Sequence, residues 1–148
     1  MPTENNLTKE LISFLASTYA LYLKTQNFHW NVTGPHFISL HAFLDSQYKE
    51  LAEAIDTIAE QIRVLDTFIP ADFAHFQKLS TISNATENLS ATAMIKTLLN
   101  DHQALHIEMK KLTKICEEAD DFATQDLIIE RLRSHEKTIW ILKSLLIK

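Results

Sequence analysis

Apolar residues recur every three or four positions along four long stretches of this chain, and this spacing is the strongest constraint on its fold. Such a spacing places the apolar side chains on one face of a helix, because a helical turn takes 3.6 residues. Residues that form turns are scarce, since the 148 residues include one glycine and three prolines. The chain is therefore expected to be all-α, with a few long helices and few connections between them.

The four apolar stripes cover residues 7–28, 40–65, 89–115 and 127–145. Each is long enough for several helical turns and amphipathic enough to bury one face against a neighbour. Thr8 is a candidate for the N-cap of the first helix, because a threonine before an apolar repeat is typical of a helix start. The sequence thus predicts four helices that pack together.

The segment between the second and third stripes, residues 66–86, does not keep the helical spacing. It is too long for a tight turn between antiparallel helices, so we expect it to cross the bundle, with a short helix around residues 71–79. One long connection and two short ones predict a ferritin-like four-helix bundle. At 148 residues, the chain is expected to form one domain over residues 1–148.

Charge and cysteine content argue against several classes of function. A formal net charge of −5 disfavours a nucleic-acid surface made by bulk electrostatics. Cys116 is the only cysteine, so neither an intrachain disulfide nor a cysteine metal site is expected. The opening MPTENNLTKE lacks the features of a signal peptide, and no apolar run approaches the roughly 18 residues of a membrane span. We expect a cytoplasmic protein that does not enter the membrane.

Histidines gather at the one glycine, in the stretch NFHWNVTGPHFISLH at residues 27–41. Gly34 and Pro35 end the first helix and lead into the second, which should bring His29 and His41 close together. Taken alone, His29 has an ordinary interpretation, an imidazole that hydrogen-bonds a carbonyl at the helix end. The crowding of histidines makes a metal site the alternative.

The second helix carries a polar stripe apart from its apolar face, formed by His41, Asp45, Asp56 and Glu60. A solvated charged face is the ordinary interpretation of these carboxylates. However, they form two i,i+4 pairs, a spacing at which two side chains can hold one ion. The two pairs lie about 16 Å apart at 1.5 Å per residue, so one chain cannot bring both to one ion.

The two pairs are placed symmetrically about the point between Glu50 and Leu51. If two copies of the helix packed antiparallel across a two-fold axis, His41 would lie level with the second copy's Glu60, and Asp45 with its Asp56. Each dimer would then hold two identical sites with ligands from both chains, and His29 would be a third ligand from the first chain. Imidazole and carboxylate without sulfur suit Fe(II), with zinc or manganese as competitors.

The stretch 27–62 resembles the Dps family of miniferritins. The family pattern His-Trp-Asn-Val-x-Gly-x-x-Phe-x-x-Leu-His, followed by Asp four residues later and by Asp-x-x-x-Glu, is present at every position. The resemblance implies a dodecameric cage, built from two-fold dimers, that oxidises Fe(II), preferentially with hydrogen peroxide, and stores ferric mineral. It implies that the metal ligands are His29, His41 and Asp45 from one chain with Asp56 and Glu60 from another.

The resemblance also implies roles for residues beside the site. Trp30 would quench or relay oxidising equivalents, although packing at an interface is an equally good interpretation. Acidic residues would line an iron-entry pore at a three-fold axis, or else form a charge cluster at a helix N-terminus. Glu50 and Glu53 would line the cage cavity. The candidate pore residues are Asp120, Asp121, Asp126 and Glu130.

The chain departs from some relatives in ways that bear on function. Ferritins with an intrachain di-iron centre use Glu-x-x-His pairs, and no such pair occurs in this sequence. DNA-binding members often carry a lysine-rich tail, whereas no lysine or arginine precedes Lys9 here, so DNA binding is expected to be weak. The alternative function is a DNA-binding nucleoid protein with little ferroxidase activity. A secreted member is neither supported nor opposed by any pattern. The remaining histidines are interpreted as surface, core or capping residues: His36, His75, His102, His106 and His135.

Overall fold

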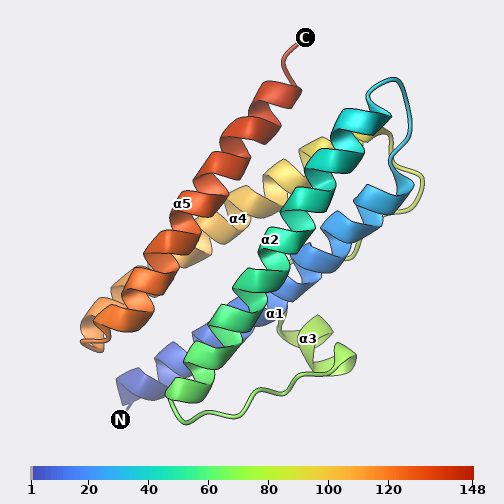
Figure 1. The fold of residues 1–148 in the computed structure, drawn as a ribbon. Helices are drawn as coiled ribbons and strands as arrows, with labels where there is room; N and C mark the ends of the chain where they lie inside the picture. Colours follow the sequence, from blue (N-terminus) through green and yellow to red (C-terminus); the bar gives the residue numbers. More distant parts are fainter. Residues whose placement is uncertain (1) are drawn as a thin grey trace.

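The structure is a computed structural model that describes the backbone of residues 2–148 and the side chains from residue 6 onward. In this range the chain forms five helices and no strand, which confirms the predicted ferritin-like bundle (Figure 1). None of the described helices is long and apolar enough to span a membrane. The helices are α1 (Pro2–Asn31), α2 (Phe37–Val64), α3 (Phe73–Leu79), α4 (Ala91–Glu118) and α5 (Phe122–Leu145).

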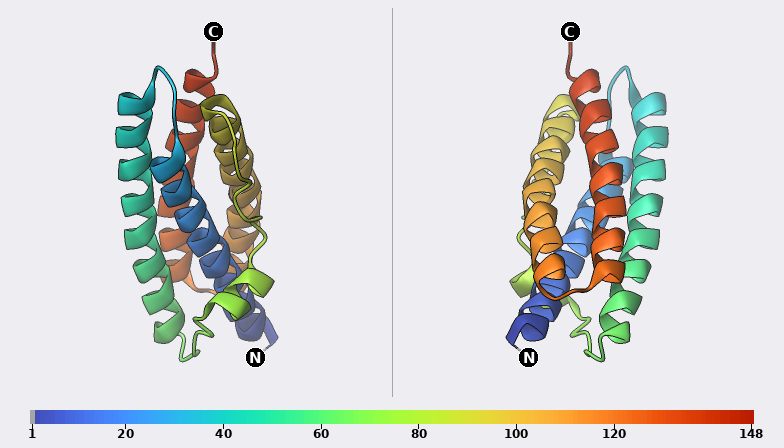
Figure 2. Two further views of the ribbon diagram at one scale, coloured as in Figure 1. Left: turned by 90° about the vertical axis from the view of Figure 1, so that its right-hand side faces the viewer. Right: turned by 90° about the vertical axis from the view of Figure 1, so that its left-hand side faces the viewer.

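The four long helices form two antiparallel pairs, α1 with α2 and α4 with α5, and α1 also packs against α4. The connection from α2 to α4 runs along the length of the bundle, so these two helices point in the same direction (Figure 2). The short helix α3 lies within this connection and packs against α1. The long crossover and the short helix that the sequence predicts are therefore both present.

The ends of the later helices follow from local capping. The side chains of Asp72, Ser90 and Asp121 accept hydrogen bonds from the backbone N–H three residues ahead and so begin α3, α4 and α5. The prediction that Thr8 begins the first helix is wrong, since α1 already starts at Pro2. Proline suits the first helical position because its fixed φ matches the helix and its missing N–H is not needed there.

The corner between α1 and α2 depends on backbone conformation at Gly34. Its φ of +113° is one that L side chains rarely adopt, although a Cβ at this position would meet nothing within 4 Å. Glycine is therefore required by the backbone and not by crowding. The Gly34 carbonyl accepts from the Phe37 N–H at 3.1 Å, which starts α2 within three residues of the turn. This tight corner holds the end of α1 beside the first turns of α2.

The apolar stripes form one continuous core between the helices. Phe14 and Phe28 of α1, Leu44 and Ile58 of α2, and Leu105 of α4 are almost completely buried. Burial of this kind contributes about 1.5–3 kcal/mol for each large apolar side chain. Because the stripe of α2 faces this core, the polar stripe of the same helix is left on the outside of the bundle.

Cys116 is also in the core, and its thiol should be unreactive in the folded protein. Burial, together with the nearby Asp121 carboxylate, raises the pKa of Cys116 from 9.0 to about 11. At pH 8 the thiolate fraction is then about 100-fold smaller than at the ordinary pKa. We expect iodoacetamide to label the native protein at least that much more slowly than the unfolded chain.

The same shift predicts the direction of a pH effect on stability. The folded state keeps the Cys116 proton at a pH where the unfolded chain releases it. This contribution is complete below pH 9 and is lost as the pH rises from 9 to about 11. Between pH 9 and about 11, the free energy of unfolding of a Cys116→Ala variant should therefore fall less than that of the unchanged protein. Urea unfolding at several pH values measures the difference. Rapid labelling of the native thiol at pH 8 would contradict the assigned shift.

Candidate metal centre

His29 and His41 meet at the corner between α1 and α2. Their rings stack with centroids 3.9 Å apart and an interplanar angle of 14°. The His29 Nδ1 lies 2.8 Å from the His41 carbonyl oxygen, and the His41 Nδ1 lies 2.8 Å from the His29 carbonyl oxygen. The two residues therefore hold each other in place through reciprocal bonds between the ends of two helices.

These reciprocal bonds determine the tautomer of each ring. A carbonyl oxygen only accepts hydrogen bonds, so the Nδ1 of both histidines carries the proton. With Nδ1 engaged by a carbonyl, Nε2 is the ring atom that remains for a metal ion. A backbone carbonyl at Nδ1 is a common arrangement in metal-binding histidines, because it orients the ring.

Asp45, one turn further along α2, turns toward the same place. Its Oδ1 lies 3.9 Å from the His29 Nε2 and accepts a 3.2 Å hydrogen bond from the Tyr48 hydroxyl. The other oxygen accepts from the Lys49 ammonium at 2.9 Å, and this bond holds the pKa of the Asp45 carboxyl below its ordinary value. Asp45 is consequently ionised at neutral pH and available as a ligand.

Sequence reasoning missed the two side chains that position Asp45. Tyr48 also contacts the His29 ring, with centroids 5.2 Å apart. Lys49 follows Asp45 at i+4, a spacing from which the ion pair is predictable. The side chain of Lys49 is about two-thirds exposed, with a relative accessibility of 65%, so it can move aside when a cation approaches.

Asp56 and Glu60 lie further along α2, and both are exposed. The helical rise of about 1.5 Å per residue puts Asp56 about 16 Å from Asp45, and Glu60 about 28 Å from His41. Within the described part of a single chain, no group of three histidine, cysteine or acidic side chains is arranged to hold a metal ion. The structure therefore brings together His29, His41 and Asp45, and leaves Asp56 and Glu60 apart on the same outer face.

The other predicted site residues lie on the surface. Trp30 follows His29 and has a relative accessibility of 62%. Asp121 is the N-cap of α5, where its carboxylate accepts from the Thr124 N–H and hydroxyl. Asp126 and Glu130, one turn apart on α5, are exposed.

Several side chains that the sequence left without partners pair across helices. The His106 Nε2 lies 2.9 Å from a Glu136 carboxylate oxygen, while His102 and His135 meet inside the bundle. Glu50 is held by Arg131 of α5 and is not free. These pairs join residues 30 or more positions apart, so no local spacing in the sequence indicates them.

Comparison with known proteins places this chain in a family. The model of the ferritin-like domain matches residues 8–148. The DNA protection during starvation protein of Brevibacillus brevis is 36% identical over 132 residues, which cover 89% of each chain. The crystal structure of a Dps protein from Bacillus brevis matches with a TM-score of 0.97 and 33% identity, over 99% of both chains.

A further solved structure is relevant to the chemistry. The Dps protein from Vibrio cholerae O1, a member of a broad superfamily of ferritin-like diiron-carboxylate proteins, matches with a TM-score of 0.95. It is 26% identical, and the match covers 99% of this chain and 92% of that one. The similarity in fold therefore extends over nearly the whole length of both molecules.

Proposed function

This chain belongs to the Dps branch of the ferritin-like family, and we propose that it stores and detoxifies iron by oxidising Fe(II) at sites shared between two subunits. The observation that carries the proposal is the pair of stacked histidines whose Nε2 lone pairs are left free beside the ionised Asp45. Two imidazoles with a carboxylate suit Fe(II) and leave coordination positions open for an oxidant.

The second half of each site comes from another chain. An antiparallel packing of two α2 helices about the point between Glu50 and Leu51 brings the second copy's Asp56 and Glu60 to Asp45 and His41. In the same packing Lys49 lies level with the exposed Ala52 of the other copy, whose small side chain leaves room for the lysine to move. Every dimer then holds two equivalent sites, and neither forms in an isolated chain.

In the reaction, Fe(II) and hydrogen peroxide are the substrates. Peroxide accepts two electrons, one from each of two Fe(II) ions, and the ferric product is deposited as mineral inside a dodecamer. Removing both reactants in the cytoplasm prevents their direct reaction with each other, which protects the cell from oxidative damage. His29, His41 and Asp45 hold iron from one side, while Asp56 and Glu60 hold it from the other.

Surface residues have secondary roles in this proposal. Exposed Trp30, next to His29, is placed to intercept oxidising equivalents that leave the site. Asp121, Asp126 and Glu130 form an acidic entrance for Fe(II) where three subunits meet. Asp121 reaches that entrance from its capping position at the start of α5.

The proposal is tested by stopped-flow measurement of Fe(II) oxidation on particles sized by light scattering. Twelve chains of 17.0 kDa should give a particle of about 200 kDa. Fe(II) oxidation should be faster with hydrogen peroxide than with oxygen, and the ferric product should remain soluble inside the particle. A monomeric protein, or one that does not accelerate the oxidation of Fe(II), would refute the proposal.

The alternative function, a DNA-binding nucleoid protein with little ferroxidase activity, has weaker support. The net charge of −5 opposes binding to a phosphate backbone, whose affinity comes largely from lysine and arginine contacts. A gel shift that persists at physiological salt, together with absent iron oxidation, would favour it over the proposal above.

A further inference from the structure

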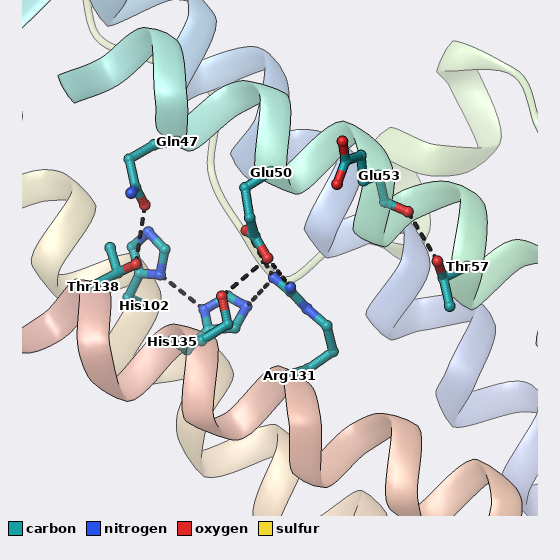
Figure 3. Close-up of polar contacts among 9 residues, drawn as sticks. Gln47, Glu50, Glu53, Thr57, His102, Arg131, His135 and Thr138 are labelled. Carbon is teal, nitrogen blue, oxygen red and sulfur yellow. Dashed lines mark hydrogen bonds and ion pairs between the residues drawn. The ribbon is translucent and has the colours of Figure 1, made fainter. Parts of the chain in front are cut away.

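A second polar cluster lies between α2, α4 and α5, and the proposed function makes no use of it. Arg131 of α5 donates through both terminal nitrogens to the Glu50 carboxylate of α2, and Nη2 also lies 3.2 Å from the His135 Nε2. His135 in turn bonds His102 of α4, with the two Nδ1 atoms 2.8 Å apart. Figure 3 shows this chain of contacts from Glu50 through Arg131 to the two imidazoles.

The arginine and the two histidines of the cluster are shielded from solvent, whereas the Glu50 side chain is 40% exposed at the edge of the cluster. His102, Arg131 and His135 have relative accessibilities of 3%, 8% and 1%. Burial and the nearby guanidinium lower the pKa of His102 to about 3, and burial with the neighbouring His102 lowers the pKa of His135 well below its ordinary value. Both imidazoles are therefore neutral at physiological pH, and Arg131 supplies the positive charge opposite Glu50.

The hydrogen bonds also determine the orientation of protons in the two rings. A guanidinium only donates, so the His135 Nε2 must accept with its lone pair. The proton of His135 is then on Nδ1 and is donated to the His102 Nδ1. The lone pair of His135 thus points at the guanidinium, and His102 holds the ring in that orientation from behind.

Two groups therefore direct acceptor atoms toward the guanidinium. They are the Glu50 carboxylate, through both oxygens, and the His135 Nε2. The Ser134 hydroxyl donates to the Glu50 carboxylate at 3.0 Å and so helps to hold it in place. Sites that combine carboxylate with imidazole bind iron and zinc in proteins. A second histidine hydrogen-bonded behind the first is the arrangement that orients metal ligands in proteins.

The guanidinium is not fully matched to these surroundings. Its two terminal nitrogens bond the cluster, but Nε is buried without a hydrogen-bond partner among the described residues. Arg131 therefore interacts with the cluster through its two terminal nitrogens and its positive charge, and not through Nε. The same carboxylate and imidazole acceptors would also attract a divalent cation if the guanidinium were removed.

We propose that Arg131 occupies a latent divalent-metal site formed by Glu50 and His135 and so keeps metal ions out of the bundle interior. Arginine is always protonated and is tethered beside the two acceptor groups, so an incoming ion would have to displace it from a buried position. The interior of the bundle is where di-iron proteins of related architecture hold metal with inward glutamates and histidines. In this chain the bundle interior instead holds the fixed positive charge of the Arg131 guanidinium.

The proposal predicts that removing the guanidinium creates a metal site. The assembled Arg131→Ala protein should bind one cobalt(II) ion per chain more than the unchanged protein, with new visible absorption, as ligands become available. Zinc at about a hundredfold over its Kd should raise the Tm of this variant by roughly 5–10 °C relative to its metal-free form. This rise should exceed any change that zinc causes in the Tm of the unchanged protein. If Arg131→Ala does not assemble, Arg131→Gln removes the charge with a smaller change in volume.

The control is Arg131→Ala combined with His135→Ala, which should lose both the extra cobalt ion and the extra zinc-dependent rise. In the unchanged protein, Glu50→Gln and His135→Ala should leave the number of bound metal ions unaltered, because no ion occupies the interior. An equal metal count in Arg131→Ala and the unchanged protein would overturn the proposal, as would loss of an ion on Glu50→Gln alone. These counts do not depend on whether the shared sites oxidise iron.

Discussion

Replacing either His41 or Asp56 by alanine is expected to slow peroxide-driven oxidation of Fe(II) by at least roughly 100-fold, since even changes behind the direct ligands cost 10–100-fold in metal sites. His41 presents its Nε2 lone pair beside His29, and its loss removes a ligand together with half of the reciprocal bonding at the corner. Asp56 is exposed on the outer face of α2, so its removal should not disturb the fold of a chain. Stopped-flow traces of variants confirmed as assembled particles measure the effect.

The chain offers matched controls for both variants. His36 lies at the same corner but is exposed, and Glu53 is an exposed acidic residue on the same helix as Asp56. His36→Ala and Glu53→Ala should keep the initial oxidation rate within about twofold, as surface changes away from a site usually do. Unchanged kinetics in Asp56→Ala, or an equal loss in Glu53→Ala, would show that the assigned ligands are wrong.

Mixing the two inactive variants in one particle should restore activity. A chain with His41→Ala still supplies Asp56, and a chain with Asp56→Ala still supplies His41. A dimer of the two therefore contains one complete site and one that lacks both residues. Random pairing should return about a quarter of the sites, since half of the dimers are mixed and each has one of two sites intact. Coexpression with two different tags allows the mixed particles to be isolated and assayed.

The matching control mixes His41→Ala with His29→Ala chains. Both variants damage the same half of the site, so neither pairing produces a complete one and activity should stay at the level of the single variants. Recovery in the first mixture but not in the second is specific to sites shared between chains. If neither mixture recovers although mixed particles form, the ligands come from one chain and the two-fold packing of α2 is wrong.

The fold was predictable because its information is local. A three- and four-residue apolar spacing defines a helix face, and a segment without that spacing, residues 66–86, must be a connection. The start of α1 was misplaced at Thr8 because the residues before it have no apolar repeat, although nothing there opposes a helix. The site at the corner was partly predictable for the same reason, since only a short turn around Gly34 separates His29 from His41.

The sequence by itself thus determined the helices, their connectivity and the juxtaposition of His29, His41 and Asp45, because each depends on residues close in the chain. Only the tertiary structure decided that the rings of His29 and His41 stack and that each Nδ1 bonds the other residue's carbonyl oxygen. It also decided that Glu50 pairs with Arg131 and that His102 pairs with His135. The Glu50–Arg131 and His102–His135 contacts depend on the rotation and axial offset of helices or residues that are far apart in sequence, and the ring stacking depends on how α1 and α2 rotate against each other beyond the corner. The packing of the whole core sets both quantities, so no local pattern in the chain encodes them.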